Sequence, residues 1–118
     1  MNLADIAKNI VTLAERSGAT QAEVYSIRVR TSSTYIDDDI PKIGGSINEF
    51  GIGLKYIQSK RIGYTCSTLA QETPEAVVER ARSIAHVSNE DPKFVSLPSP
   101  QKPSGSPDMY HDSETAAA

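Results

Sequence analysis

The sequence has few of the residues from which disulfide frameworks and metal clusters are built. Of its 118 residues, one is cysteine, two are histidine and none is tryptophan. A single cysteine excludes an intramolecular disulfide and a cysteine zinc cluster, and it favours a reducing compartment. No apolar run approaches the roughly twenty residues of a membrane-spanning helix, and the first residues do not resemble a signal peptide. We therefore expect a cytoplasmic protein with no membrane partner.

The net charge is small, and it is unevenly distributed. The formal net charge is −3, and residues 89–118 account for all of it with five acidic and two basic side chains. Residues 1–88 are therefore neutral. Binding to DNA or RNA depends on clustered lysine and arginine side chains that displace counterions from phosphates. The neutral segment at residues 1–88, called the body below, gives no sign of such a cluster. We therefore expect no direct nucleic-acid partner.

Proline is concentrated near the C-terminus. Five of the seven prolines lie after residue 88, within a stretch that is also rich in serine. Such a composition can form neither a strand ladder nor a hydrophobic core, and it is typical of an extended linker. We expect one domain at residues 1–92, followed by a flexible linker or tail at residues 93–118.

The rest of the chain alternates between helical and strand periodicity. Apolar side chains recur at helical spacing from Leu3 to Ala14, and Thr73 and Pro74 are typical of the start of a second helix. Between them the period is two, and it predicts strands at residues 23–30, 33–37, 40–47, 51–57 and 61–67. The expected class is α+β: a two-layer sandwich with an antiparallel sheet of four to five strands and both helices on one face.

The last two predicted strands form a hairpin whose register follows from their apolar side chains. If Tyr56 lies opposite Ile62, one core face collects Ile52, Leu54, Tyr56, Ile62, Tyr64 and Cys66. This register predicts a three-residue loop at 58–60.

The other face of that hairpin is then unusually thin, because it carries three glycines. Glycine weakens the interior of a strand, so its presence there needs a reason. A bulge or coiling of the sheet is one reason, and close approach of another backbone or domain is the other. The candidate surface for contact with a peptide or a domain consists of Gly51, Gly53, Lys55, Gly63 and Thr65.

We expect no catalytic and no metal-binding residues in this chain. The acidic run Asp37, Asp38 and Asp39 is typical of a solvated hairpin tip. Cys66 is expected on the core face, where it would be inert, and neither His86 nor His111 has an evident partner. The sequence contains no metal-binding histidine pair, phosphate-binding loop or serine nucleophile elbow.

Several segments, taken in order, resemble the N-terminal domain of the TldD/PmbA family, the "modulator of DNA gyrase" proteins. These are residues 18–25 (GATQAEVY), 51–57 (GIGLKYI), 61–65 (RIGYT), 75–92 and 109–112 (MYHD). The Ala-Glu-Val-Tyr segment that starts at Ala22 and the long linker at residues 93–118 resemble the PmbA, or TldE-like, branch more closely. The sequence departs from the family at two hairpin turns, residues 37–39 and 58–60, the second of which is one residue longer than the family's usual turn.

The resemblance implies a part of a metallopeptidase. In TldD-type members, a His-Glu-x-x-x-His motif in the larger C-terminal domain holds zinc, and no position here matches that motif. The resemblance thus implies a non-catalytic domain with no cofactor of its own, which contributes to substrate enclosure and to a subunit interface. Its implied partners are its own missing C-terminal domain, a TldD-type subunit or a second copy, and a peptide substrate.

Two other classes of function compete with this one. One is a free-standing adaptor without an enzymatic role, which could use the acidic C-terminal linker to bind a basic partner. A gyrase-binding or DNA-binding role is suggested only by the name of the family, and the neutral body argues against DNA contact.

Overall fold

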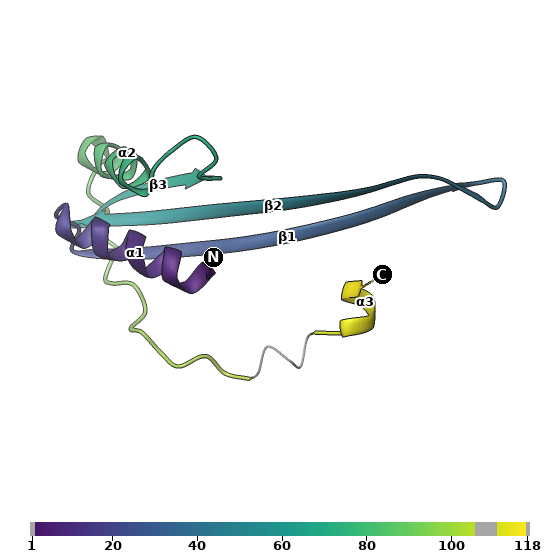
Figure 1. Cartoon of the computed structure of the whole chain (residues 1–118). Helices are drawn as coiled ribbons and strands as arrows, with labels where there is room; N and C mark the ends of the chain where they lie inside the picture. Colours follow the sequence, from purple (N-terminus) through teal and green to yellow (C-terminus); the bar gives the residue numbers. More distant parts are fainter. Residues whose placement is uncertain (1, 106–110, 118) are drawn as a thin grey trace.

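The computed structural model describes residues 2–105 and 111–117, which form an antiparallel sheet with helices packed on it (Figure 1). The order of elements is α1 (Leu3–Arg16), β1 (Gln21–Asp37), β2 (Ile40–Gln58), β3 (Arg61–Ser67), α2 (Pro74–Val87) and α3 (Ser113–Ala117). The sheet has three strands in the order β1-β2-β3. The predicted α+β class with an antiparallel sheet is confirmed.

The predicted strand segments are all extended, but they join into fewer and longer strands. Residues 23–30 and 33–37 both belong to β1, and residues 40–47 and 51–57 both belong to β2. Nothing between the segments stops a strand, because Thr31 and Ser32 are compatible with extended backbone. Gly44 and Gly45 pair with Thr34 and Ser33, so the two glycines remain within the ladder.

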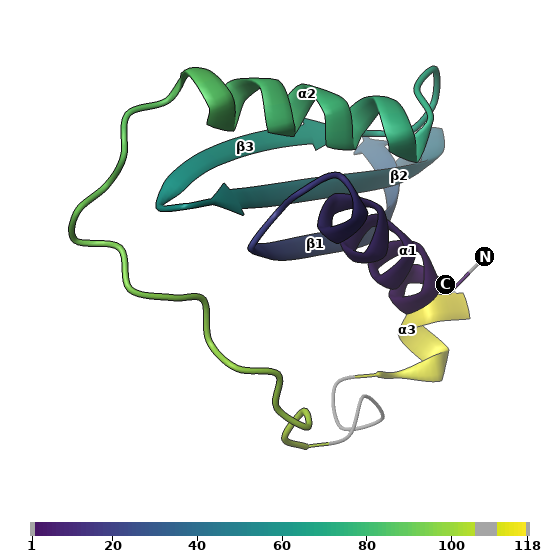
Figure 2. The same ribbon diagram turned by 90° about the vertical axis from the view of Figure 1, so that its left-hand side faces the viewer.

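Both long helices begin where local capping signals predict. The Asn2 side chain accepts a hydrogen bond from the Ala4 amide at 2.8 Å, and the Thr73 hydroxyl accepts one from the Ala76 amide at 3.2 Å. Each cap satisfies an amide that has no partner inside its helix. α1 packs on β1, α2 packs on β2 and β3, and the helices touch each other on the same side of the sheet (Figure 2).

The core lies between this sheet face and the two helices. Its central side chain is Tyr56, which is fully buried and whose hydroxyl lies 3.1 Å from the Ser17 hydroxyl at the end of α1. That hydrogen bond satisfies the one polar atom of the ring. The buried residues around it are Ile10, Ala14, Ile52, Leu54, Val77, Val78, Ala81 and Ala85.

The predicted register of the β2–β3 hairpin is wrong by one residue. Gln58 pairs with Arg61, so the turn contains only Ser59 and Lys60, whose φ angles are +50° and +68°. Two positive φ angles are the mark of a tight hairpin turn that matches strand twist. Tyr56 consequently lies opposite Gly63 rather than Ile62. Because successive side chains alternate between faces, this shift moves every side chain of β3 to the face opposite the predicted one.

β1 and β2 continue together well beyond the two-layer body. Residues 28–49, called the arm below, form a two-stranded ribbon that projects from the body (Figure 1). The described side chains from Ile27 to Glu49 are all exposed, and the molecule measures 59 × 32 × 28 Å. Asp38 and Asp39 form the tip with positive φ angles, so this acidic run lies at a hairpin turn, as predicted.

The chain after α2 has no helix or strand as far as residue 105, yet its beginning is attached to the sheet. The Asp91 amide donates to the Lys60 carbonyl at 2.9 Å, and the Leu97 amide donates to the Gln21 side chain at 2.9 Å. The domain boundary at residue 92 stays a prediction. In the family-like segment at 109–112, Met109 and Tyr110 lie outside the described residues.

Candidate functional site

The structure divides the five residues of the predicted contact surface between the two faces of the sheet. Directly paired residues share a face, so Gly63 and Thr65 lie with Tyr56 and Leu54 beneath the helices. Gly51, Gly53 and Lys55 lie on the other side, on which none of the long helices of the described residues packs and which we call the open face.

α2 accounts for Gly63. A Cβ atom at this position would lie 2.1 Å from the Ala81 carbonyl oxygen and 2.7 Å from the Ala85 amide nitrogen. Such distances are far below van der Waals contact, so only glycine allows the helix to approach β3 this closely. The glycine that was expected to admit an outside partner is covered by the chain's own helix.

Thr65 is also committed to the interior of the domain. It is 6% exposed, and its hydroxyl accepts a hydrogen bond from Arg80 Nε at 2.7 Å. Gly63 and Thr65 therefore cannot reach a molecule that contacts Gly51, Gly53 and Lys55 across the open face.

The open face holds a shallow groove between two exposed tyrosines. Its lining includes Tyr25 and Ile27 from β1, Gly51 and Gly53 from β2, and Tyr64 and Cys66 from β3. Tyr25 is 64% exposed and Tyr64 is 56% exposed. Aromatic side chains with a wet hydroxyl are common where proteins bind partners, because they offer apolar area and one hydrogen bond.

The two glycines form the floor of this groove. A Cβ at Gly53 would lie 2.8 Å from the Tyr64 hydroxyl, so the tyrosine leans over the bare backbone. A Cβ at Gly51 would lie 3.5 Å from Ile27 Cγ2, which is an ordinary contact. The Tyr64 ring thus occupies part of the space that a side chain at Gly53 would fill. At Gly51 the backbone of β2 stays accessible beside Ile27. Lys55 lies one pair farther along, opposite Glu23 and Tyr64.

Cys66 is on the open face and exposed, so the prediction that it belongs to the core is wrong. The shifted register is the reason, because it turns Cys66 away from the helices. Hydrogen bonding to the Cys66 side chain, followed by the charge of that group and by burial, raises the pKa of the Tyr64 hydroxyl. This shift favours the protonated hydroxyl, which can donate a hydrogen bond.

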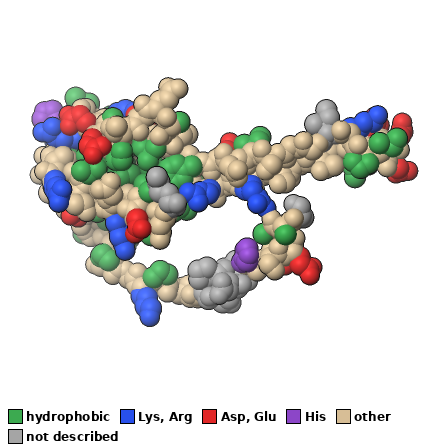
Figure 3. All heavy atoms as spheres, viewed as in Figure 1, with side chains coloured by type: hydrophobic (Ala, Val, Ile, Leu, Met, Phe, Trp, Pro, Cys, Tyr) green, Lys and Arg blue, Asp and Glu red, His purple; other side chains and the backbone are tan. Residues whose placement is uncertain are grey.

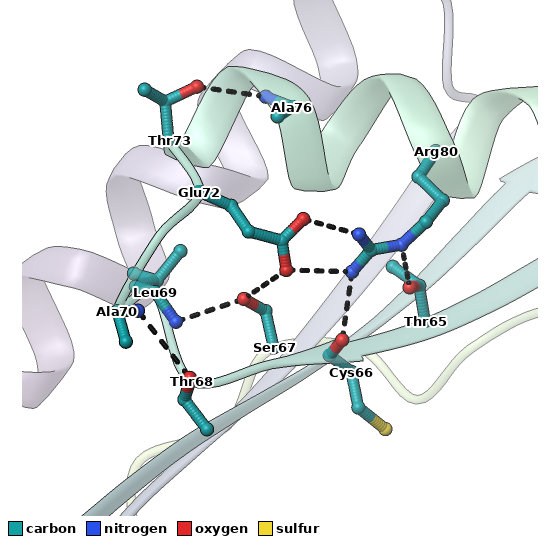
Figure 4. A network of polar contacts seen from close by, with 10 residues as sticks. All are labelled: Thr65, Cys66, Ser67, Thr68, Leu69, Ala70, Glu72, Thr73, Ala76 and Arg80. Carbon is teal, nitrogen blue, oxygen red and sulfur yellow. Dashed lines mark hydrogen bonds and ion pairs between the residues drawn. The ribbon is translucent and has the colours of Figure 1, made fainter.

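A polar network fixes the end of β3 beside the groove (Figure 4). Arg80 of α2 forms an ion pair with Glu72 and donates to the Cys66 carbonyl at 2.9 Å. The Ser67 hydroxyl donates to Glu72 at 2.7 Å and accepts from the Leu69 amide at 2.9 Å. The hydrogen bond from Arg80 is the main reason that the pKa of Glu72 is lowered, and the one from Ser67 adds to it. The network joins the loop after β3 to α2 and so holds one rim of the groove.

The other candidate residues lie apart from the groove. Asp37, Asp38 and Asp39 are exposed at the tip of the arm, His86 is exposed near the end of α2, and His111 is exposed before α3. Within the described ranges, no group of three or more His, Cys, Asp or Glu side chains could hold a metal ion. No helix in the described part of the chain is long and apolar enough to cross a membrane.

Sequence reasoning did not identify the tyrosines and the arm as functional features. Apolar side chains alternate with polar ones through Tyr25, Ile27 and Val29. This period shows that the three side chains share one face of the sheet, but not whether the helices cover that face. The arm could have been suspected from the continued strand character of residues 31–36 beyond any helix able to cover it.

The chain is similar to proteins of known family and structure. Residues 22–85, more than half of the chain, match the model of PmbA/TldA metallopeptidase domain 1. No curated protein sequence matches the chain.

Three solved structures share its fold. TldE from Thermococcus kodakarensis has 19% identity over 93% of the chain, with a TM-score of 0.60. The "putative modulator of DNA gyrase" from Bacteroides thetaiotaomicron has 18% identity over 98%, with a TM-score of 0.67. The one from Thermotoga maritima has 15% identity over 96%, with a TM-score of 0.51. The chain covers 26% of each of these three structures.

Proposed function

The chain belongs to the PmbA/TldD family, whose first metallopeptidase domain it matches over residues 22–85, and from this premise we propose that it is a non-catalytic wall of a peptide-degrading assembly. In this proposal the domain helps to enclose a peptide substrate and contributes to contact between subunits. The TldE-like branch remains a prediction, because identities below 20% with the solved structures reveal the fold alone.

The observation that carries the proposal is the exposed groove on the open face. Tyr25, Ile27 and Tyr64 line this groove together with Gly51 and Gly53, and their side chains are exposed to solvent. Exposed apolar side chains gathered in one place are typical of a surface that another molecule covers. The flat glycine floor permits close approach of an extended backbone, and the tyrosine hydroxyls can bond to its peptide groups.

The proposal assigns no chemistry to this chain. Any zinc would belong to the C-terminal domain of a TldD-type subunit, and this domain would bind no cofactor. The chain's own C-terminal domain and a TldD-type subunit, or a second copy, are the proposed protein partners. A cytoplasmic location is part of the proposal, because a reducing compartment keeps the exposed thiol of Cys66 unpaired.

A peptide titration followed by amide chemical shifts tests the role of the groove. We expect oxidised insulin B chain, an extended and partly apolar peptide, to shift the amide resonances of Tyr25, Gly51, Gly53 and Tyr64. Substitution of both tyrosines, Tyr25→Ser with Tyr64→Ser, should weaken binding about tenfold, because aromatic anchors dominate such surfaces.

The matched control is Val87→Ser on α2. Val87 is 81% exposed and lies outside the groove lining, so this variant should bind the peptide as the unaltered chain does. Shifts confined to other elements, or equal binding by the double tyrosine variant, would refute the enclosing role.

A further inference from the structure

The linker after α2 lies across one end of the open face. Its first part is bonded to the turn between β2 and β3, where the Asp91 amide donates to the Lys60 carbonyl at 2.9 Å. At β1 the Leu97 amide donates to the Gln21 side chain at 2.9 Å. Gln21 pairs with Ile57, and both lie on the open face because they follow the alternation of the groove residues. Ile57 is 1% exposed although none of the long helices of the described residues packs on this face, and the linker segment between the two bonds accounts for its burial.

The groove begins a short distance farther along the same face. Gln21 is followed on this face by Glu23 and then by Tyr25, so Tyr25 lies about 13 Å along β1 from the residue that anchors the linker. Pro98 and Pro100, which come directly after the anchor, lie beside Glu23 in a second shallow pocket. The linker therefore approaches the groove to within one side chain of Tyr25.

The segment that follows the anchor is rich in proline and is held by little else. Residues 98–103 (PSPQKP) contain three prolines in six positions. Such a segment favours the polyproline II helix, which has three residues per turn and rises about 3.1 Å per residue. Pro100 and Pro103 then share one face of that helix, about 9 Å apart. All described residues from Pro98 to Gly105 are exposed, and Figure 3 shows the chain beyond the anchor arching away from the body. Few contacts oppose a movement of this segment.

The groove offers the kind of surface to which polyproline II segments bind. These segments dock between aromatic side chains, whose rings pack on the prolines and whose hydroxyls bond to the exposed carbonyls. Tyr25 and Tyr64 are carried by β1 and β3, which lie two strand spacings, or about 10 Å, apart. That separation is close to the repeat from Pro100 to Pro103. The glycine floor of β2 lies between the two strands and leaves room for the residues that join the prolines.

We propose that the groove is a binding site for a proline-rich segment in the polyproline II conformation, and that its occupant is the chain's own residues 98–103. Pro100 contacts Tyr25 and Pro103 contacts Tyr64, so the segment crosses the open face from β1 toward β3. The linker then regulates the groove, because its prolines and a substrate peptide compete for the same tyrosines. This inference rests on the peptide-binding groove of the proposed function and adds the regulation of that groove.

The short tether makes a weak contact sufficient. Only Pro98 and Ser99 separate the anchor at Leu97 from Pro100, and a short flexible tether gives an effective concentration on the order of millimolar. A groove with a Kd of about 1 mM for the segment is then about half filled. A polyproline II segment is already extended before it binds, so it loses little conformational entropy. Another peptide should bind about twofold more weakly than it would to an empty groove.

A double proline variant, Pro100→Ser with Pro103→Ser, tests the contact within the full chain. It removes both rings and keeps the anchor at Leu97. We expect the amide resonances of the groove to shift relative to those of the unaltered chain, because the groove is emptied. The amides followed are those of Tyr25, Gly51, Gly53 and Tyr64.

The matched control is Gln101→Ser. Gln101 lies between the two prolines in the sequence but on another face of the polyproline II helix. This variant should therefore leave the groove resonances where they are in the unaltered chain.

A free peptide tests the class of ligand independently of the tether. Added to the double proline variant, the heptapeptide LPSPQKP should shift the same groove amides, with a Kd on the order of millimolar. The heptapeptide with its three prolines replaced by serine should shift none of them. Tyr25→Ser and Tyr64→Ser, introduced together into the double proline variant, should abolish the response of Gly51 and Gly53.

Oxidised insulin B chain separates this inference from the enclosing role. The double proline variant should bind it about twofold more tightly than the unaltered chain does, and Gln101→Ser should bind it equally well. Unchanged groove amides in the double proline variant, or no response to LPSPQKP at about 10 mM, would overturn this inference whether or not insulin B chain binds. A response to LPSPQKP without binding of insulin B chain would leave the polyproline site standing and remove the enclosing role.

Discussion

Gly63 lies so close to Ala81 that a Cβ on the glycine would be 2.1 Å from the alanine carbonyl oxygen. This contact between β3 and α2 sets the distance between the two layers. It also determines which face of β3 meets the helices, because no other β3 residue lacks a side chain. The open face and its groove are a consequence of this one approach.

Substitution of this glycine should be among the most destabilising single changes in the domain. Gly63→Ala forces α2 away from β3, and overpacking of this kind costs about 1–3 kcal/mol. Because the blocking atoms are backbone, we expect the upper part of that range. Urea unfolding followed by circular dichroism measures the change in the free energy of unfolding.

Gly51→Ala is the matched control for that experiment. It adds the same methyl group to the same sheet, but its Cβ would meet Ile27 at an ordinary 3.5 Å. The free energy of unfolding should then change by less than about 1 kcal/mol. Equal losses in the two variants would show that the close approach of α2 is not the cause.

Glu72 should make the stability of the domain depend on pH in the acidic range. Hydrogen bonds from Arg80 and then Ser67 lower its pKa in the folded state below the ordinary value of 4.5. A lowered folded-state pKa means that the ionised group stabilises the fold above pH 4.5. That contribution is lost as the pH falls through the lowered value. We expect the urea midpoint of Glu72→Gln to lie below that of the unaltered chain at pH 7.

At pH values below the lowered pKa, the same two midpoints should converge. Glu79→Gln is the control, because Glu79 is an exposed partner of Arg82 on the surface of α2 and should change the midpoint little at either pH. A difference between Glu72→Gln and the unaltered chain that stays constant down to pH 2 would contradict the role of the ionised carboxylate.

The isolated chain should show no zinc-dependent peptide hydrolysis. Its described residues offer no cluster of three metal-binding side chains, and activation of water by zinc needs such a set together with an open position. The measurement is cleavage of a fluorogenic peptide with added zinc and with a chelator. Turnover that the chelator abolishes would mean that this chain contains a catalytic site.

The helices and the class of fold could be predicted because their signals are local. Asn2 and Thr73 cap helices wherever the neighbouring residues are helical, and Pro74 favours a first helical turn without help from the rest of the chain. The period of two between the helices likewise depends on neighbouring residues alone. Those features, together with the acidic tip at Asp38 and Asp39, needed no tertiary information.

The face of each strand was decided by packing between distant parts of the chain. The predicted β2–β3 register, with Ile62, Tyr64 and Cys66 in the core, would bury more apolar side chains. It would, however, direct these side chains toward α2, which approaches β3 too closely to leave room for them. The structure instead pairs Tyr56 with Gly63 and leaves Tyr64 exposed. The contact of Gly63 with α2 joins residues about twenty positions apart, and no local pattern encodes it. The amino-acid sequence by itself therefore determined the elements and their order, whereas the tertiary structure decided the register, the open face and the uncovered arm.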